Sequence, residues 1–297
     1  MKLNKLTIGI STATATAAFH LLGAVDPAAA FGITGLDTQN NLVFFDSANP
    51  SAVTGSVGVT GLQTGESLLG IDYRPATGEL YGIGSSSQIY LINQTTGTAT
   101  AIGSPFSPTV VGNAFGVDFN PVPDRIRVVS NAGQNLRLNP DTGTGIMDGN
   151  LAYAVSDVNT NQPPNIAAAA YTNSVAGAQT TALYVIDTAL DVLVLQSPPN
   201  AGILNTVGSL GVNFSNLAGF DILTLNGTDT AFASSNSSLY NINLATGSAT
   251  FIGDVGSSAT LRDIAVQPVP EPTTMAGALL GGSAIAFFRR RRNQSAE

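Results

Sequence analysis

Three arginines lie close together in the stretch FNPVPDRIRVVSNAGQNLRLNP, residues 119–140. They are Arg125, Arg127 and Arg137, and the chain from 31 to 270 has only two more arginines and no lysine. A guanidinium group binds planar oxyanions such as carboxylates through two parallel hydrogen bonds. The cluster therefore indicates a site for an anionic ligand, a patch for a protein partner, or an internal network of ion pairs.

Composition removes most catalytic chemistry. The only histidine is His20, near the N-terminus, and residues 31–268 contain no histidine, cysteine, lysine or tryptophan. This excludes Ser-His-Asp and Cys-His nucleophiles, Schiff bases, and metal sites built on thiolate or imidazole. Paired carboxylates acting on glycosidic bonds are what remains, and Asp72 and Asp118 are the candidates. A carbohydrate-active enzyme, hydrolase or lyase, is thus one alternative to a binding module.

Acidic loops are the candidates for a metal site. Asp141 and Asp148 flank the sequence TGTGIM, and Asp254 and Asp263 flank a Gly/Ser loop. Calcium prefers carboxylate and carbonyl oxygens, but no D-x-[DN]-x-[DN]-G spacing occurs. The sequence therefore predicts no cofactor and assigns no metal ligand, with Ca²⁺ at these loops as the alternative.

The charge of the central region limits its partners. Residues 31–270 carry sixteen acidic side chains against five arginines, so the net charge is about −11. Affinity for nucleic acid and for anionic membranes depends on basic residues. We therefore expect no nucleic-acid partner, and contact with a membrane only through the C-terminal tail before it is processed.

The residues that could do chemistry are carried by an internal repeat. Four similar segments place Asp72, Asp118, Ala170 and Asp221 at equivalent positions, with steps of 46, 52 and 51 residues. Each copy contains four short apolar or alternating runs separated by turn residues, which is typical of a four-stranded propeller blade. In the first copy these runs are 71–73, 80–83, 89–92 and 99–102.

Both ends of this region complete a further blade. Residues 261–268 resemble a first strand, and the runs 32–36, 42–46 and 52–57 resemble a second, third and fourth strand. A blade built from both termini closes the ring and removes open sheet edges. We predict an all-β fold, a propeller of five four-stranded blades closed by the C-terminal strand. The loose spacing of residues 152–165 leaves six blades as the alternative.

The repeat gives the arginines sibling positions in the other blades. Arg127 aligns with Tyr81, Tyr184 and Phe232, and Arg137 with Tyr90, Val194 and Tyr240. Such positions pack between blades, where an arginine can stack on an aromatic ring and pair with Asp124, Asp118 or Asp72. The predicted site, either a ligand site or an inter-blade network, comprises Asp124, Arg125, Arg127, Asn135 and Arg137. No residue is assigned as catalytic or as binding a cofactor.

The arginine-rich stretch also carries a family signature. The pattern F-N-P-x-x-D-R-x-R-V-V-S, followed by G-x-N-x-R-x-N-P, is matched at every position between 119 and 140. In this it resembles a bacterial family of exported, propeller-like domains of unknown function, and the resemblance extends over nearly all of residues 31–268. It implies the fold and carries no established activity.

The two ends of the chain predict its destination. Residues 1–30 have a basic start, an apolar stretch and an A-x-A site, which predicts a signal peptide cut after Ala30. Residues 269–297 hold Pro270, Glu271 and Pro272, an apolar run and four arginines, and so resemble the PEP-CTERM sorting tail. That resemblance implies processing by an exosortase-type peptidase and delivery to the Gram-negative surface or extracellular matrix. A simple C-terminal anchor is the alternative.

Together these features predict a function without naming a ligand. We expect residues 31–268 to form an exported, non-catalytic binding module of the cell surface or matrix, with acidic polysaccharide as a candidate ligand. The alternatives are the carbohydrate-active enzyme and a purely structural envelope protein.

Overall fold

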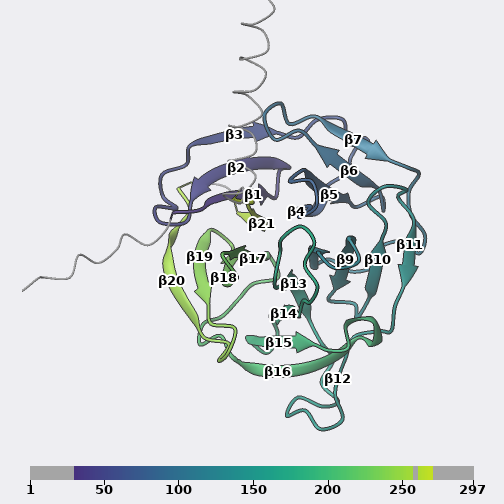
Figure 1. Ribbon diagram of the computed structural model, residues 1–297, viewed down its shortest axis with the longest axis vertical. Helices are drawn as coiled ribbons and strands as arrows, with labels where there is room; N and C mark the ends of the chain where they lie inside the picture. The colour runs from purple at the N-terminus through teal and green to yellow at the C-terminus, as the bar shows by residue number, and fades with distance from the viewer. Residues whose placement is uncertain (1–29, 257–259, 270–297) are drawn as a thin grey trace, which may run out of the picture.

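Five antiparallel sheets stand around a common axis as the blades of a propeller (Figure 1). The computed structural model describes residues 30–256 and 260–269. The predicted signal peptide up to residue 29 and the sorting tail, with Pro270, Glu271 and Pro272, lie outside these residues. Among the described residues there is no helix of the length and hydropathy needed to cross a bilayer.

Blades 1 to 3 each have four strands. In blades 2 and 3 the strands follow one another outward from the axis in the order of the sequence, whereas the innermost strand of blade 1 is β21, the last strand of the chain. Blade 1 consists of β21 (Leu261–Val266), β1 (Gly32–Asp37), β2 (Asn41–Asp46) and β3 (Gly55–Gly58). Blade 2 consists of β4 (Leu68–Tyr73), β5 (Leu80–Gly84), β6 (Ile89–Ile92) and β7 (Ala99–Ile102). Blade 3 consists of β8 (Phe115–Asn120), β9 (Arg125–Ser130), β10 (Asn135–Leu138) and β11 (Gly145–Met147).

Blades 4 and 5 complete the ring. Blade 4 consists of β13 (Ile166–Tyr171), β14 (Leu183–Asp187), β15 (Val192–Gln196) and β16 (Ile203–Ser209), with β12 (Ala152–Tyr153) added at the outer edge. A short 3₁₀ turn, η1 (Pro199–Ala201), joins β15 to β16. Blade 5 consists of β17 (Ala218–Leu225), β18 (Thr228–Ser235), β19 (Ser238–Ile242) and β20 (Ala249–Asp254).

The ring has five blades and closes where the sequence predicted. Strand β21 pairs with β1 in antiparallel register, from Ile33 opposite Val266 to Asp37 opposite Leu261. The loosely spaced segment after residue 151 supplies no sixth blade. It contributes β12, which runs parallel to β16 and makes blade 4 five-stranded. Blade 4 therefore keeps the four predicted antiparallel strands and has a short fifth strand added at its edge.

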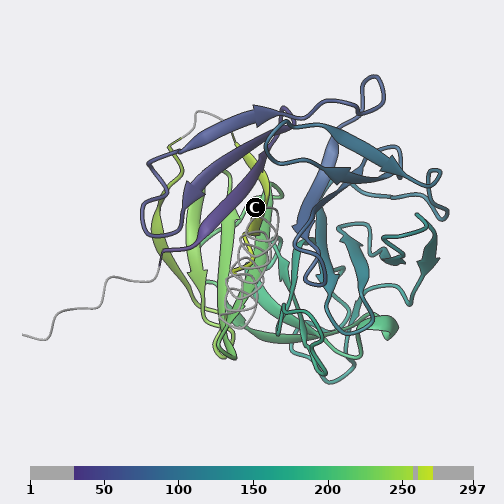
Figure 2. The same cartoon turned by 45° about the horizontal axis from the view of Figure 1, so that its top comes forward.

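The core consists of layers between neighbouring blades, which stand face to face around the axis (Figure 2). Five separate hydrophobic clusters lie one at each junction, such as the cluster of Val129, Tyr171 and Val194 between blades 3 and 4. The inner strands are buried on both faces. Their closest approach requires small residues: a Cβ added to Gly116 would lie 2.5 Å from the backbone nitrogen of Ala169 in the next blade.

Glycines form the turns between the third and fourth strands in blades 2, 3 and 5. Gly97, Gly143 and Gly247, each after a threonine, have φ of 72°, 75° and 84°. Glycine adopts this left-handed conformation without the steric cost of a Cβ, which is why the hairpins turn at these pairs.

Candidate functional site

Arg127 joins blades 3 and 4 through a buried polar network. Its side chain is only 1% exposed, and all three nitrogens of the guanidinium donate hydrogen bonds. Nη1 lies 2.7 Å from Oδ2 of Asp148 and 2.7 Å from Oδ1 of Asn135. Nη2 lies 2.7 Å from Oδ1 of Asn200, and Nε lies 3.2 Å from the hydroxyl of Tyr171. Since Tyr171 and Asn200 belong to blade 4, the arginine links the two sheets.

Arg137 reaches the same carboxylate from the neighbouring strand. Its Nε and Nη2 donate to the two oxygens of Asp148 at 2.8 and 3.0 Å. Burial alone would raise the pKa of Asp148, but hydrogen bonds from Arg137 and Arg127 outweigh it and hold the pKa below its ordinary value. The sequence had named Asp124, Asp118 or Asp72 as the partners of these arginines, and that expectation was wrong. Asp148 had been considered only as a calcium ligand.

Strand pairing tests the sibling positions assigned from the repeat. Arg127 lies opposite Asp118 on the inner strand of its blade. In the same way, Tyr81 lies opposite Asp72, Tyr184 opposite Ala170 and Phe232 opposite Asp221. The alignment of Arg127 is therefore confirmed. The alignment of Arg137 was shifted by one residue. Arg137 lies opposite Arg127, and the residues in that position in the other blades are Leu91, Leu195 and Asn241.

Asn135 holds the loop of blade 4 against the network. It is fully buried, and its Nδ2 donates at 3.0 Å to the carbonyls of Gly149 and Pro199. Gln196 lies beside it and donates to Oδ1 of Asn135 at 3.3 Å, while its own Oε1, which is buried, accepts no hydrogen bond from the described residues. Sequence reasoning missed Gln196, the last residue of β15, although it is a polar residue where the other blades have the apolar residues Ile92, Leu138 and Ile242.

Asp124 serves a second centre, between blades 2 and 3. The guanidinium of Arg74 donates to both oxygens of Asp124 and to Oδ1 of Asp141, and it lies over the ring of Tyr81 at 5.9 Å. The hydrogen bonds to Asp124 raise the pKa of Arg74, and burial lowers it. The hydrogen bonds prevail, so the pKa lies above its ordinary value. The structure thus separates Asp124 from Arg127 and Arg137 and joins it to an arginine that was not among the predicted site residues.

The other carboxylates considered for calcium have partners as well. Asp254 accepts a hydrogen bond from Ser238 at 2.7 Å, and Asp263 accepts from the backbone nitrogens of Ile71 and Ile264, both at 2.9 Å. Asp263 is buried and acts as a link between blades 1 and 2.

Three further carboxylates meet at the propeller axis. Asp72, Asp118 and Asp221 are buried on β4, β8 and β17, with one oxygen of each within 4.8 Å of the others. Of the described residues, these three form the group that could hold a metal ion. Their oxygens accept hydrogen bonds at 2.5–3.0 Å from one backbone N–H in every inner strand, namely Tyr73, Phe119, Tyr171, Ile222 and Val266.

The count of these bonds explains why three carboxylates serve five blades. Ala170 and Ala265 stand where the other blades have aspartate, and they offer no acceptor. Asp72 and Asp221 each use both oxygens, one for their own strand and one for the next blade. Asp118 uses Oδ1 for Tyr171, and no described residue donates to its Oδ2. The triad therefore fastens the inner strands to one another.

The shared location has an electrostatic consequence. Burial, followed by the negative charge of the neighbouring carboxylates, raises the pKa of Asp72 and Asp118 well above the ordinary value. Burial raises the pKa of Asp221 to about 6. Carboxylates this close cannot all be ionised without strong repulsion, so the triad retains protons to higher pH than isolated carboxylates do.

A groove of about 430 Å³ lies at the junction of blades 3 and 4, above the Arg127 network. It is lined by amide, hydroxyl and proline side chains from both blades: Asn120, Val122, Pro123, Gln179, Thr180, Thr181, Pro198, Pro199 and Asn200. We call it the blade 3–4 groove. Arg125 lies beside the groove, since it pairs with the lining residue Asn120 across β8 and β9 and is on the same face of β9 as Arg127, which reaches Asn200 of blade 4. Nη1 of Arg125 donates to the carbonyl of Pro123 at 3.3 Å and to that of Asp124 at 2.8 Å.

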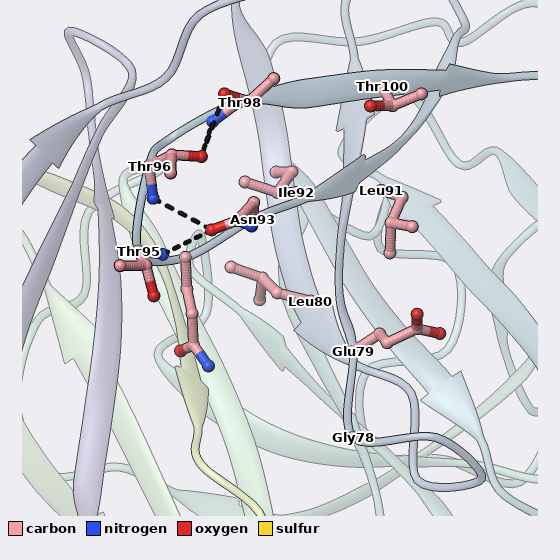
Figure 3. A pocket seen from close by; sticks show the side chains of 11 residues that line it. Gly78, Glu79, Leu80, Leu91, Ile92, Asn93, Thr95, Thr96, Thr98 and Thr100 are labelled. Carbon is pink, nitrogen blue, oxygen red and sulfur yellow. Dashed lines mark hydrogen bonds between the residues drawn. The ribbon is translucent and has the colours of Figure 1, made fainter.

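A larger groove, of about 650 Å³, follows the edge of blade 2 (Figure 3). All of its lining residues belong to that blade, and four of them are threonines, with Glu79 as the single carboxylate. Asn93 is committed to its own turn, since its Oδ1 accepts from the nitrogens of Thr95 and Thr96. The lining residue Gln94 accepts a hydrogen bond at 2.7 Å from the hydroxyl of buried Tyr73, which is also bonded to Thr34 of blade 1.

Comparisons with solved structures return propeller-sized but distant matches. A nidogen/laminin complex is 12% identical with a TM-score of 0.45, and covers 80% of this chain and 84% of that one. A structural genomics protein of unknown function from Bacteroides thetaiotaomicron is 15% identical with a TM-score of 0.47, with coverage of 80% and 64%. An auxiliary nutrient binding protein from Bacteroides ovatus is 13% identical with a TM-score of 0.40, with coverage of 68% and 56%. All three have TM-scores below 0.5, and no curated protein matches this chain in sequence.

Two family models match the chain. The PEP-CTERM protein-sorting motif matches residues 268–292, which supports export to the envelope or surface of a Gram-negative bacterium and implies processing by exosortase-type machinery. The model described as "Domain of unknown function (DUF4394)" matches residues 41–265, almost the whole propeller. With a match over well over half of its length, the chain belongs to the DUF4394 family.

Proposed function

We propose that this protein is an exported, non-catalytic binding module that holds extracellular polysaccharide at the cell surface or in the surrounding matrix. The observation that carries the proposal is the blade 3–4 groove. It is open, it is contributed by two blades, and amides, hydroxyls and proline faces line it. Sugar polymers present hydroxyl groups and apolar C–H faces, which this combination of side chains can satisfy.

The groove is also held in a fixed shape. Arg127 anchors Asn200 from below at 2.7 Å, and Asn135 anchors the carbonyl of Pro199 at 3.0 Å. Both anchors are buried, and they fix the blade 4 wall relative to blade 3. A preorganised site loses less conformational entropy on binding, which favours affinity.

The placement of the carboxylates favours binding over glycoside hydrolysis. Asp72 and Asp118 are 5% and 2% exposed, and their oxygens accept backbone hydrogen bonds. A glycosidase needs two carboxyl groups that flank an accessible sugar and exchange protons with it. If these residues were catalytic, product release from an extracellular polymer would be lost in Asp72→Asn and Asp118→Asn.

Binding can be tested by blocking the groove. Thr180 is exposed on its wall, so Thr180→Trp should fill the blade 3–4 groove without disturbing the core. We expect retention on immobilised extracellular polysaccharide to be lost. The matched control is Thr95→Trp, an exposed threonine of the blade 2 groove, which should bind as wild type does. Loss of binding in the control alone would move the ligand to blade 2, and no binding by wild type to any polysaccharide would refute the proposal.

A further inference from the structure

We infer that Arg125 makes the blade 3–4 groove selective for carboxylated sugar units, such as uronic acids, over neutral ones. This inference rests on the proposed polysaccharide-binding function of the same groove.

The hydrogen bonds of Arg125 leave one edge of its guanidinium available. Nη1 is held by the carbonyls of Pro123 and Asp124, which fixes the plane of the group beside the groove. Within residues 30–256 and 260–269, Nε and Nη2 donate to no acceptor. These two nitrogens form the side of the guanidinium that receives a carboxylate through two parallel hydrogen bonds.

Arg125 differs in this respect from three other arginines of the propeller. Arg74, Arg127 and Arg137 each form an ion pair with an aspartate of the protein. No described carboxylate forms an ion pair with Arg125, although the side chain is half-buried and Asp124 is its neighbour in the sequence. The charge of Arg125 therefore lies beside the groove without a counter-ion among the described residues.

The acidity of the protein does not oppose this assignment at the groove itself. None of the residues that line the groove is acidic. The nearest acidic residue in the sequence, Asp124, is neutralised by Arg74. At physiological ionic strength, exposed charges are largely screened beyond about 8 Å. The field that a bound carboxylate meets is thus dominated by Arg125, whereas the blade 2 groove presents Glu79 and would repel an anion.

The test compares two polymers that differ in the carboxyl group alone. The exported protein is passed over polygalacturonate and over the same polymer after its carboxyl groups have been reduced to alcohols. We expect wild type to prefer the carboxylated polymer by about tenfold to a hundredfold, the range for a hydrogen-bonded charge pair. Arg125→Gln should lose this preference and retain the weaker affinity for the reduced polymer. Arg125→Lys should recover only part of it, because lysine keeps the charge but not the paired geometry.

Arg137→Gln provides the control for net charge. It removes one positive charge from the same hairpin, but that charge is already paired with Asp148, so the preference should persist. If Arg125→Gln keeps the wild-type preference, the inference is wrong while the proposed function stands. If wild type binds both polymers equally, Arg125 does not select. If wild type binds neither polymer, or any other polysaccharide, the proposed function fails together with the inference.

Discussion

Arg127 and Asp148 form an ion pair with 2.7 Å between Nη1 and Oδ2, in a space where the two side chains are 1% and 7% exposed. Burying two charges costs more than a surface pair does, unless further hydrogen bonds satisfy the remaining donors and acceptors. Here the remaining N–H groups of Arg127 donate to Asn135, Asn200 and Tyr171. Arg137 donates a further hydrogen bond to the carboxylate of Asp148. The pair is therefore dependent on its neighbours and sensitive to the loss of either member.

Arg127→Gln should destabilise the propeller strongly. The substitution leaves Asp148 buried with one cation instead of two and removes the links to blade 4, which we expect to lower the free energy of unfolding by about 3–5 kcal/mol. Arg137→Gln is the matched control, since Arg137 is 31% exposed and its loss should cost about 1 kcal/mol or less. Urea unfolding of both variants measures the difference. Equal stability of the two would show that the network does not support the junction.

The axial triad should make the propeller more stable in mild acid than at alkaline pH. Burial raises the folded-state pKa of Asp221 from 3.8 to about 6, and those of Asp72 and Asp118 well above the ordinary value. The contribution of such groups to stability is complete below the unfolded-state pKa and is lost as the pH rises through the folded-state pKa. For Asp221 alone the shift corresponds to about 3 kcal/mol. Thermal unfolding in the presence of a chelator should therefore occur at lower temperature at about pH 8 than at about pH 5.

Carboxylates whose pKa is lowered by folding limit this trend at low pH. The pKa of Asp148 lies below its ordinary value, so its contribution is present above the unfolded-state pKa and is lost as the pH falls through the folded-state pKa. Stability should thus pass through a maximum in the mildly acidic range. A melting temperature that rises steadily from pH 5 to pH 8 would contradict the account of the triad.

Asparagine substitutions distinguish the members of the triad by their hydrogen bonds. Asp118→Asn keeps Oδ1 for Tyr171 and removes one of the repelling charges, so at pH 8 we expect greater stability and a weaker dependence on pH. Asp72→Asn relieves the same repulsion but loses one of two acceptors, leaving Tyr73 or Phe119 with a buried N–H that lacks a partner. Such a group costs about 1–3 kcal/mol. Chemical unfolding at pH 8 should place Asp118→Asn above Asp72→Asn, and the reverse order would show that the second oxygen of Asp72 is dispensable.

The ring could be predicted because its signals are local and repeated. Strand-length runs recur in each copy and Thr-Gly turns in three of the four, and the match between residues 261–268 and the first strands located the closure. The position of Arg127 followed from the same periodicity, since it shares a register with Tyr81. One extra strand in blade 4 escaped because two residues of β12 carry no periodic signal.

The contacts of the site could not be predicted to the same degree. Which aspartate pairs with Arg127 depends on how two sheets face each other, and sequence spacing does not specify that geometry. Asp148 reaches it from the outermost strand region, and Asn200 reaches it from the next blade. The error of one residue in the alignment of Arg137 had a direct consequence. Side chains in a strand alternate between faces, so a single-residue error in alignment moves a side chain to the opposite face.

Glycines of the inner strands provide a last test of how tightly the ring is closed. A Cβ at Gly116 would lie 2.5 Å from the backbone nitrogen of Ala169, and the backbone of the adjacent inner strand cannot yield as a side chain can. Gly116→Ala should therefore push blades 3 and 4 apart and lower the free energy of unfolding by about 1–3 kcal/mol or more. For a domain of this size each kcal/mol lowers the melting temperature by about 2–4 °C. Gly55→Ala is the control, because its Cβ would meet only Phe44, at 3.6 Å, and replacing glycine in an unstrained position stabilises by restricting the unfolded chain. Equal melting temperatures for the two variants would mean that a Cβ at residue 116 is tolerated, and that the inner strands of blades 3 and 4 are not packed as closely as the structure shows.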